Sequence, residues 1–348
     1  MSAASDTHAF YSDNTASVAP ELLAAIAAAN DGAQKAYGDD PWTLQLDAAF
    51  SEFFGTPVRA FVVTTGTAAN ALSLATLSPP YGNVYAHAGA HVVEDECGAV
   101  EFFSGGARLT LVPAEHGRID CEALTEAITQ HPANVHTVQP AALTLTQATE
   151  LGTAYRPQQI AALSVLAHHH GLRVHMDGAR LANAIDFLDC QPADVTWRAG
   201  VDVLSFGATK NGALAAEAVV FFDPALVRDF ELRRKRAGHL LSKSRYAAAQ
   251  LLTYVRSGLW RTHAQHANRL AQQLAAAAGA RLLHPVEANE LFLDLGAVGK
   301  AALRAQGFGF YDWGPPAGRE ARFVVSWDQS QRSVDALCQA LRAPLPAA

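Results

Sequence analysis

A lysine and an aspartate stand at two predicted strand ends that could bring them into one site. Asp177 follows an apolar segment in HMDGAR, and Lys210 lies in SFGATKNG, a turn after the next strand segment. Open α/β sheets bind ligands outside the carboxyl ends of their strands. An amine that is desolvated in such a cleft has a lowered pKa and becomes nucleophilic toward a carbonyl. The two positions therefore predict a site for an aldehyde cofactor.

Three features fit pyridoxal 5'-phosphate (PLP). A carboxylate such as Asp177 can pair with the cationic pyridine nitrogen and keep the ring an electron sink. In TTGTAAN, Gly66 and Thr67 open a helix after a strand, and free N–H groups at a helix start bind anions. His91 follows another strand and could stack on a planar ring. Taken one at a time, Asp177 would be read as a helix cap and Lys210 as a surface lysine. The start at Gly66 would be read as an ordinary helix start, and His91 as a structural histidine.

Short apolar segments alternate with helical patterns over the first two thirds of the chain. The predicted strands cover 59–64, 83–88, 107–113, 136–147, 172–176, 201–206 and 217–222, and the helices include 66–77, 122–130 and 157–170. This alternation indicates a doubly wound, mostly parallel sheet. The pattern is helical from about 225 to 280 and mixed from 284 to 341, which predicts a second, smaller α+β domain.

Composition excludes several classes of protein. Of the 348 residues, 50% are hydrophobic and 17% are charged, as in ordinary globular proteins. The 26 basic and 33 acidic residues give a net charge of −7, whereas proteins that bind nucleic acid are usually basic. No window approaches the ~18 consecutive apolar residues of a membrane-spanning helix. We expect neither a nucleic-acid nor a membrane partner.

Local motifs narrow the choice further. The start MSAASDTHAFYSDN lacks a secretory signal pattern, so we expect a cytoplasmic protein with reduced cysteines. Motifs such as G-x-G-x-x-G, Walker A, H-E-x-x-H and G-x-S-x-G are absent from the sequence. The consecutive residues His168, His169 and His170 point in different directions on a helix, so no metal site is predicted. The basic run 232–236 predicts a solvated helix face.

Seven ordered motifs, spanning essentially the whole chain, resemble the L-threonine aldolases and especially their low-specificity branch. They are YSDN, AYGDDPW, TTGTAAN, the GAH of His91, HMDGAR, Thr209-Lys210 and ARFVVSWD. The resemblance implies fold type I of the PLP-dependent enzymes, in the aspartate-aminotransferase-like superfamily. This is an α/β fold whose large domain has a mixed, mostly parallel sheet flanked by helices. We expect an N-terminal arm over 1–18, a PLP-binding domain over 19–250 and a small C-terminal α+β domain over 251–348.

The same resemblance implies roles around the cofactor. Lys210 would bind the PLP aldehyde covalently, Asp177 would pair with the pyridine nitrogen, and His91 would stack on the ring. Arg180 would lie beside the phenolic oxygen of PLP. The phosphate would be held by Gly66, Thr67 and Ala68.

Other residues are expected to bind the substrate. Arg322, Arg180 and Ser12 would bind its carboxylate, a bidentate task to which Arg is suited. Tyr37 would lie near the site of a neighbouring subunit. Many threonine aldolases have a second histidine that contacts the β-hydroxyl of the substrate. The corresponding segment of this sequence is TQATE (146–150), so Thr149 or Gln147 would take the place of that histidine.

The implied activity is retro-aldol cleavage of L-threonine, L-allo-threonine and related β-hydroxy-α-amino acids such as phenylserine, to glycine and an aldehyde. His91 is the candidate base, directly or through water. A β-eliminating lyase or an aminotransferase would share Lys210 and Asp177, and a silent PLP-binding protein would share the fold. A NAD-dependent dehydrogenase would need the glycine fingerprint. We expect a homotetramer, a dimer of dimers with shared active sites; the preferred aldehyde and the Cβ stereochemistry are left open.

Overall fold

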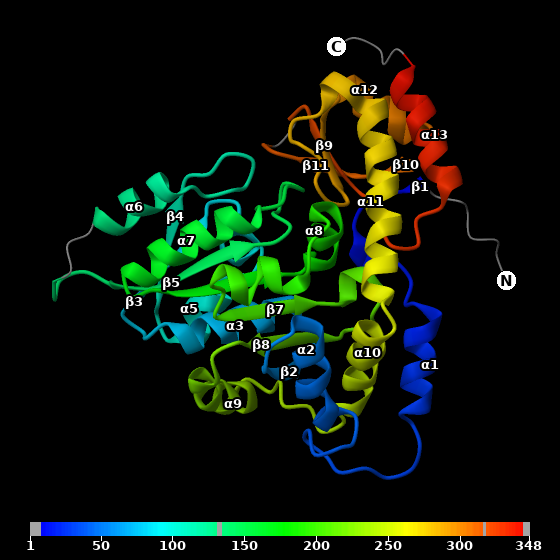
Figure 1. Cartoon of the computed structure of the whole chain (residues 1–348). Coiled ribbons are helices and arrows are strands. Elements are labelled where there is room, and N and C mark those ends of the chain that lie inside the picture. The colour runs from blue at the N-terminus through cyan, green and yellow to red at the C-terminus, as the bar shows by residue number, and fades with distance from the viewer. Residues whose placement is uncertain (1–7, 131–133, 316–317, 344–348) are drawn as a thin grey trace.

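A seven-stranded sheet lies at the centre of the larger part of the molecule (Figure 1). The structure is a computed structural model that describes residues 8–130, 134–315 and 318–343. The strand order is β2-β8-β7-β6-β5-β3-β4. The strands are β2 (Arg59–Val63), β3 (Gly82–His87), β4 (Arg108–Val112), β5 (Gln139–Thr146), β6 (Arg173–Gly178), β7 (Val203–Gly207) and β8 (Glu217–Phe221).

The sheet is mixed but mostly parallel, as predicted. Strands β4, β3, β5, β6 and β7 pair in parallel, whereas β8 runs antiparallel to both β7 and β2. Because β8 is reversed, its first residue, Glu217, is paired with Gly207 at the end of β7 and with Val63 at the end of β2. Asp177 is paired with Thr146 of β5 and Ser205 of β7. One edge of the sheet therefore gathers side chains from five strands.

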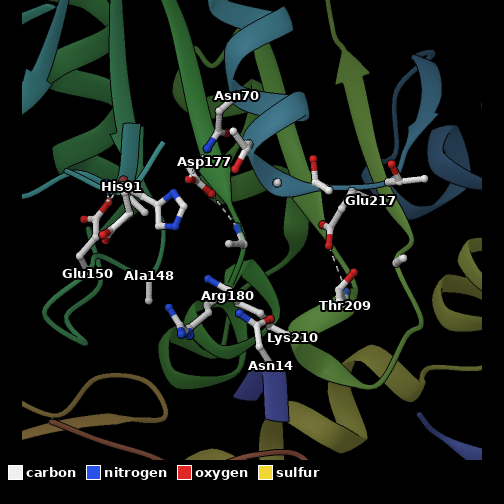
Figure 2. A pocket seen from close by; sticks show the side chains of 18 residues that line it. Asn14, Asn70, His91, Ala148, Glu150, Asp177, Arg180, Thr209, Lys210 and Glu217 are labelled. Atoms are coloured by element: carbon white, nitrogen blue, oxygen red, sulfur yellow. Dashed lines mark hydrogen bonds between the residues drawn. The ribbon is translucent and has the colours of Figure 1, made fainter. Parts of the chain in front are cut away.

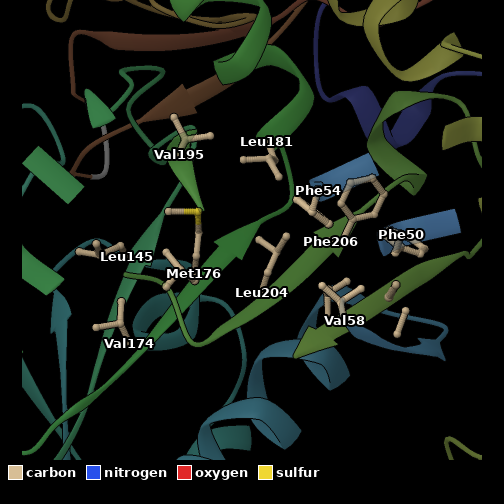
Figure 3. Close-up of a cluster of buried hydrophobic side chains, with 14 of the residues drawn as sticks. Phe50, Phe54, Val58, Leu145, Val174, Met176, Leu181, Val195, Leu204 and Phe206 are labelled. Atoms are coloured by element: carbon tan, nitrogen blue, oxygen red, sulfur yellow. The ribbon is translucent and has the colours of Figure 1, made fainter. Parts of the chain in front are cut away.

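Helices cover both faces of this sheet, because neighbouring strand residues face opposite sides. One core packs against α3 (Gly66–Leu77), α5 (Ala99–Ser104) and α9 (Val227–Arg236). The other (Figure 3) packs against α2 (Leu46–Phe54), α6 (Cys121–Thr129), α7 (Pro157–His169), α8 (Leu181–Leu188) and α10 (Arg245–Arg256). On β7, Val203 joins the first core and Leu204 the second. The larger part of the molecule also contains α1 (Pro20–Ala28) and α4 (His91–Glu94).

A separate hydrophobic core lies in the C-terminal part of the chain, beside the end of α11 (Leu259–Ala278) (Figure 1). It includes β9 (Glu290–Asp294), α12 (Gly296–Ala305), β12 (Glu320–Val324) and α13 (Gln331–Arg342). An antiparallel sheet has the order β11-β12-β9, with β11 at Tyr311–Trp313. From the N-terminal arm, β1 (His8–Ala9) pairs with β10 (Phe308–Gly309), and Phe10 enters the core. The domain limits at 18 and 250 stay predictions.

Two sequence expectations differ in detail from the structure. The helical stretch over 225–280 consists of α9, α10 and α11, and Gly238 (φ +80°) and Gly258 (φ +77°) take left-handed conformations between them. The basic run 232–236 ends α9, and its member Arg234 is not solvated: it is 6% exposed and lies over the ring of Phe61. In the described residues, no helix is long and apolar enough to cross a membrane.

Candidate active site

A cavity of about 460 Å³ lies at the carboxyl edge of the parallel strands (Figure 2). Its size is typical of a small-molecule site. Six of the predicted residues line it together: Gly66, Thr67, His91, Asp177, Arg180 and Lys210. The structure therefore brings together side chains from α3, α4, the end of β6 and the turn after β7.

Asp177 is a buried carboxylate held by two donors. Its Oδ1 accepts from the Ala179 N–H at 2.9 Å, and its Oδ2 accepts from the Asn70 amide at 2.7 Å. The same Asn70 nitrogen also donates to Glu96 Oε1 at 2.8 Å. Sequence reasoning gave no role to Asn70, the last residue of TTGTAAN, or to Glu96, because their roles arise from tertiary hydrogen bonds. Asp177 is thereby oriented at the strand end with its charge directed to the cavity.

His91 is held by Glu96 on the side away from the solvent. The ring Nδ1 lies 2.8 Å from Glu96 Oε1, and the Glu96 side chain is fully buried. The hydrogen bond to Glu96 raises the pKa of His91, although desolvation opposes the shift. Glu96 thus fixes the tilt of the imidazole, as a flat ring that packs against a ligand requires.

Hydrogen bonds of its neighbouring residues hold the turn with Lys210 in place. Asn211 donates to the Tyr254 hydroxyl at 2.6 Å and to the Trp260 carbonyl at 2.9 Å. Next to Lys210, Glu217 accepts from the N–H groups of Ala208 and Thr209, both at 3.3 Å. Burial raises the pKa of Glu217 to about 7. Sequence reasoning missed this carboxyl, because its place depends on the reversed direction of β8.

The start of α3 offers an anion site. Thr65 caps the helix by accepting from the Ala68 N–H at 3.1 Å, so that this N–H is already used. Gly66 and Thr67 line the cavity, whereas Ala68 is buried and lies outside its lining. A Cβ atom on Gly66 would meet no heavy atom within 4 Å, so there is open space beside it. Unpaired N–H groups in a first helical turn can bind a phosphate.

Arg180 carries a buried positive charge between two carboxylates. Asp13 of the N-terminal arm binds it at Nε (2.7 Å) and Nη2 (3.0 Å), and Glu290 of β9 lies 3.1 Å from Nη1. Burial opposes ionisation of Asp13, but the charge of Arg180 outweighs it and lowers the pKa of Asp13. The arm and the small C-terminal sheet therefore both reach the cavity wall.

Glu150 is a further cavity residue that the sequence reasoning left without a role. It follows β5 and accepts from the Thr146 hydroxyl at 2.7 Å and from the His91 N–H at 2.9 Å. Burial raises its pKa to about 7. Its position shortly after the end of β5, at the same edge of the sheet as Asp177, was the signal that could have found it.

Five residues that were predicted to contact the substrate, counting the alternatives Thr149 and Gln147 separately, lie outside the cavity lining of this chain. Ser12 caps a short 3-10 helix by accepting from the Asn14 N–H, and it is Asn14 that lines the cavity. Thr149 is fully buried, with its hydroxyl 2.9 Å from that of Thr153, and Gln147 bonds to the backbone of Tyr155. Arg322 lies over the rings of Tyr311 and Trp313, and Tyr37 is 53% exposed beside Lys235.

This arrangement can perform amine–carbonyl chemistry. A lysine amine, a buried carboxylate and an anion-binding helix start surround one cavity that also holds an imidazole and two carboxyls with raised pKa values. Such groups can hold a phosphorylated ring, form a bond to its carbonyl and exchange protons with an amino acid.

Comparisons with known proteins agree with this geometry. The β-eliminating lyase family model matches residues 9–297. The chain is 44% identical over 340 residues to the low specificity L-threonine aldolase of Pseudomonas aeruginosa, covering 97% of each chain. It is 42% identical over 342 residues to that of a Pseudomonas species, covering 97% of this chain and 98% of the relative. The solved threonine aldolase structure from Leishmania major superposes with a TM-score of 0.90 at 26% identity, covering 96% of this chain and 98% of the other.

Proposed function

Because the chain belongs to the β-eliminating lyase family, we propose that it is a PLP-dependent, low-specificity L-threonine aldolase. It cleaves L-threonine, L-allo-threonine and related β-hydroxy-α-amino acids, including phenylserine, to glycine and an aldehyde. Extended identity to two low specificity L-threonine aldolases supports this activity. The observation that carries it is that Lys210, Asp177 and the start of α3 line a single cavity.

The residues present fit PLP. The cavity offers one amine, one buried carboxylate and one helix start with open space at Gly66, which match an aldehyde, a pyridine nitrogen and a phosphate. When bound, PLP supplies an aldehyde that condenses with amines and a protonated ring that accepts electrons. Lys210 would hold the aldehyde carbon, and Asp177 would hold the proton on the ring nitrogen. Gly66 and Thr67 would bind the phosphate, and His91 would pack on the ring.

The protein side chains also orient the amino acid. Arg180 supplies positive charge for the substrate carboxylate. Ser12 of the N-terminal arm and Arg322 of β12, which lies beside the arm, also bind this carboxylate. Arg322 supports this role because its Nε is buried without a hydrogen-bond partner in the described part of the chain. Fixing the carboxylate and the amine sets the rotation about the N–Cα bond, and with it the directions in which the Cα–H and Cα–Cβ bonds point. These directions decide which bond breaks.

We infer a homotetramer, a dimer of dimers that shares its sites. The support is that Tyr37 lies apart from the cavity of its own chain and is half exposed, as a residue that serves a neighbour would be. Multi-angle light scattering tests the mass. We also infer a cytoplasmic location, which suits the four free cysteines Cys97, Cys121, Cys190 and Cys338.

The activity is tested with the purified, PLP-loaded protein. We expect acetaldehyde and glycine in equal amounts from L-threonine and from L-allo-threonine, and benzaldehyde from phenylserine. Release of ammonia and a keto acid instead would assign a β-eliminating lyase, and amino-group transfer to a keto acid would assign an aminotransferase. Lys210→Ala should abolish turnover and the visible absorbance of bound PLP. An unchanged spectrum in that variant would overturn the lysine assignment.

A further inference from the structure

The proposed function leaves one buried carboxyl oxygen of the cavity without a partner. Glu150 Oε1 accepts from Thr146 and from the N–H of His91. Its Oε2 is buried and has no hydrogen-bond partner among the described residues. A buried oxygen without a hydrogen-bond partner is destabilising, because it has lost its hydration and gained nothing in return. Its place in the cavity wall is explained if a hydroxyl group of the ligand donates to it.

The other acid–base groups of the cavity are engaged elsewhere. Asp177 accepts from Asn70 and Ala179, and it is the partner of the ring nitrogen. Glu217 lies on the opposite side of the cavity from Glu150, beside Thr209 (Figure 2). Arg180 is bound by two carboxylates, and Lys210 is the amine assigned to the PLP aldehyde. The proton of a substrate hydroxyl therefore has to be received on the side of His91.

On that side, three acid–base groups line the cavity, His91, Asp95 and Glu150, and Asp95 is exposed whereas Oε2 of Glu150 is buried. The Nδ1 atom of His91 is bound to Glu96, and the flat face of its ring is needed for packing on the cofactor. Glu150 lies beside His91 in Figure 2, with a carboxyl oxygen that is free to accept. Glu150 is therefore the better acceptor for a hydroxyl proton.

The groups that face Glu150 keep it able to gain and lose a proton. From α4 comes His91, from β6 comes Asp177, and from the segment before α7 comes Tyr155. Burial raises the pKa of Glu150, the Thr146 and His91 hydrogen bonds lower it, and the charge of Asp177 raises it further, to about 7 in all. Arg180 and Lys210 line the same cavity. A general base works best with a pKa near the operating pH.

We propose that Glu150 takes the proton of the substrate β-hydroxyl and passes it to Cα of the glycine product, an inference that rests on the proposed retro-aldol function. The hydroxyl O–H bond breaks and an O–H bond forms at Glu150 Oε2. The electron pair of the broken O–H bond becomes the second C–O bond of the aldehyde, and the pair of the Cα–Cβ bond stays with the glycine fragment. The proton then moves from Oε2 to Cα, which restores the carboxylate.

Glu150→Gln tests this role in the PLP-loaded enzyme. Gln can still accept from Thr146 and His91 but cannot take a proton. We expect kcat for L-threonine to fall about 10²–10³-fold, with the visible absorbance of PLP retained. The acidic limb of kcat/KM, with a midpoint near pH 7 in the parent, should disappear. Glu150→Asp should recover part of the activity, and Glu94→Gln, at an exposed position of α4, should behave as the parent.

A second measurement does not depend on activity. In the cofactor-free protein, infrared difference spectra should show carboxylic acid stretches that titrate near pH 7 from both Glu150 and Glu217. The Glu150 contribution should be missing from Glu150→Gln, and the Glu217 contribution should be missing from Glu217→Gln. If Glu150→Gln does not fold, the Glu150 contribution should shift its midpoint in Glu150→Asp. A titration that neither Glu150 variant alters would overturn the proposal.

The outcomes separate this role from the activity itself. A parent enzyme that cleaves threonine, together with a Glu150→Gln variant of unchanged kcat and pH profile, would remove only the role of Glu150. A parent that releases no aldehyde from any of the substrates would remove the proposed function and this role with it.

Discussion

The amide nitrogen of Asn70 lies 2.7 Å from Oδ2 of Asp177 and donates a hydrogen bond to it. Asn70 stands on α3, the helix whose start lines the other end of the cavity at Gly66 and Thr67. One helix therefore positions both the backbone proposed to bind the phosphate and the carboxylate proposed to pair with the ring nitrogen. Its small side chains allow this close approach: nine of its residues, Asn70 among them, are buried.

Removing the Asn70 amide should weaken the site and the fold together. In Asn70→Ala, Glu96 and Asp177 both lose a donor while staying buried. We expect the free energy of unfolding to fall by about 1–3 kcal/mol, and kcat to fall by about tenfold because the ring nitrogen loses a fixed partner. Urea unfolding and aldehyde release measure the two effects. Parent-like values for both would contradict the role of Asn70.

Asp177→Asn should separate cofactor binding from turnover. The variant keeps the shape of the side chain but loses the negative charge that holds a proton on the ring nitrogen. We expect some PLP to remain bound and kcat to fall about 10²–10³-fold, as for other lost electrostatic contacts in active sites. Absorbance and steady-state kinetics test this. A purified variant with the turnover of the parent would refute the assignment of Asp177.

Arg322→Ala should act on substrate binding. Losing a charge-assisted hydrogen bond costs about 1.5–3 kcal/mol, so we expect KM for L-threonine to rise about 10–100-fold with a smaller change in kcat. The matched control is Arg319→Ala, which removes an exposed arginine paired with Asp294. Equal KM values in the two variants would rule out Arg322 as a substrate ligand.

His175 should make stability depend on pH. It is fully buried between the hydroxyls of Thr144 (2.8 Å) and Ser205 (2.9 Å), and burial lowers its pKa from 6.5 to about 4. Because the pKa is lower in the folded state, the stabilisation is present above pH 6.5 and is lost as the pH falls toward 4. The loss should reach about 3 kcal/mol. His175→Gln should show a smaller loss between pH 7.5 and pH 5 in urea unfolding; an identical loss would contradict this explanation.

Much of the fold could be predicted from periodicity alone. The helix predicted over 66–77 matches α3, and the strand predicted over 217–222 matches β8 to within one residue. The direction of β8 was beyond such reasoning, because both directions bury the same alternating side chains. For the same reason, the role of Glu217 could not be predicted, because Glu217 reaches the cavity only when β8 is reversed.

The site was predictable where one motif positions one residue. Asp177 lies near the end of β6, Lys210, Gly66, Thr67 and His91 each lie a few residues after the end of a strand, and all five line the cavity. Thr149 was chosen by its place in a motif, but alternation along that segment turns Thr146, Ala148 and Glu150 into the cavity and Thr149 away from it. Asn70 and Glu96 act through tertiary contacts, which no spacing along the chain encodes.

The buried charge of Arg180 has a consequence for how the protein is made. Its two counter-charges come from opposite ends of the polypeptide, Asp13 and Glu290. On the ribosome, the guanidinium meets the first carboxylate early and the second only after β9 has emerged. Nascent chains that stop short of β9 should therefore carry a loosely held arm, and the pocket should mature only near the end of translation.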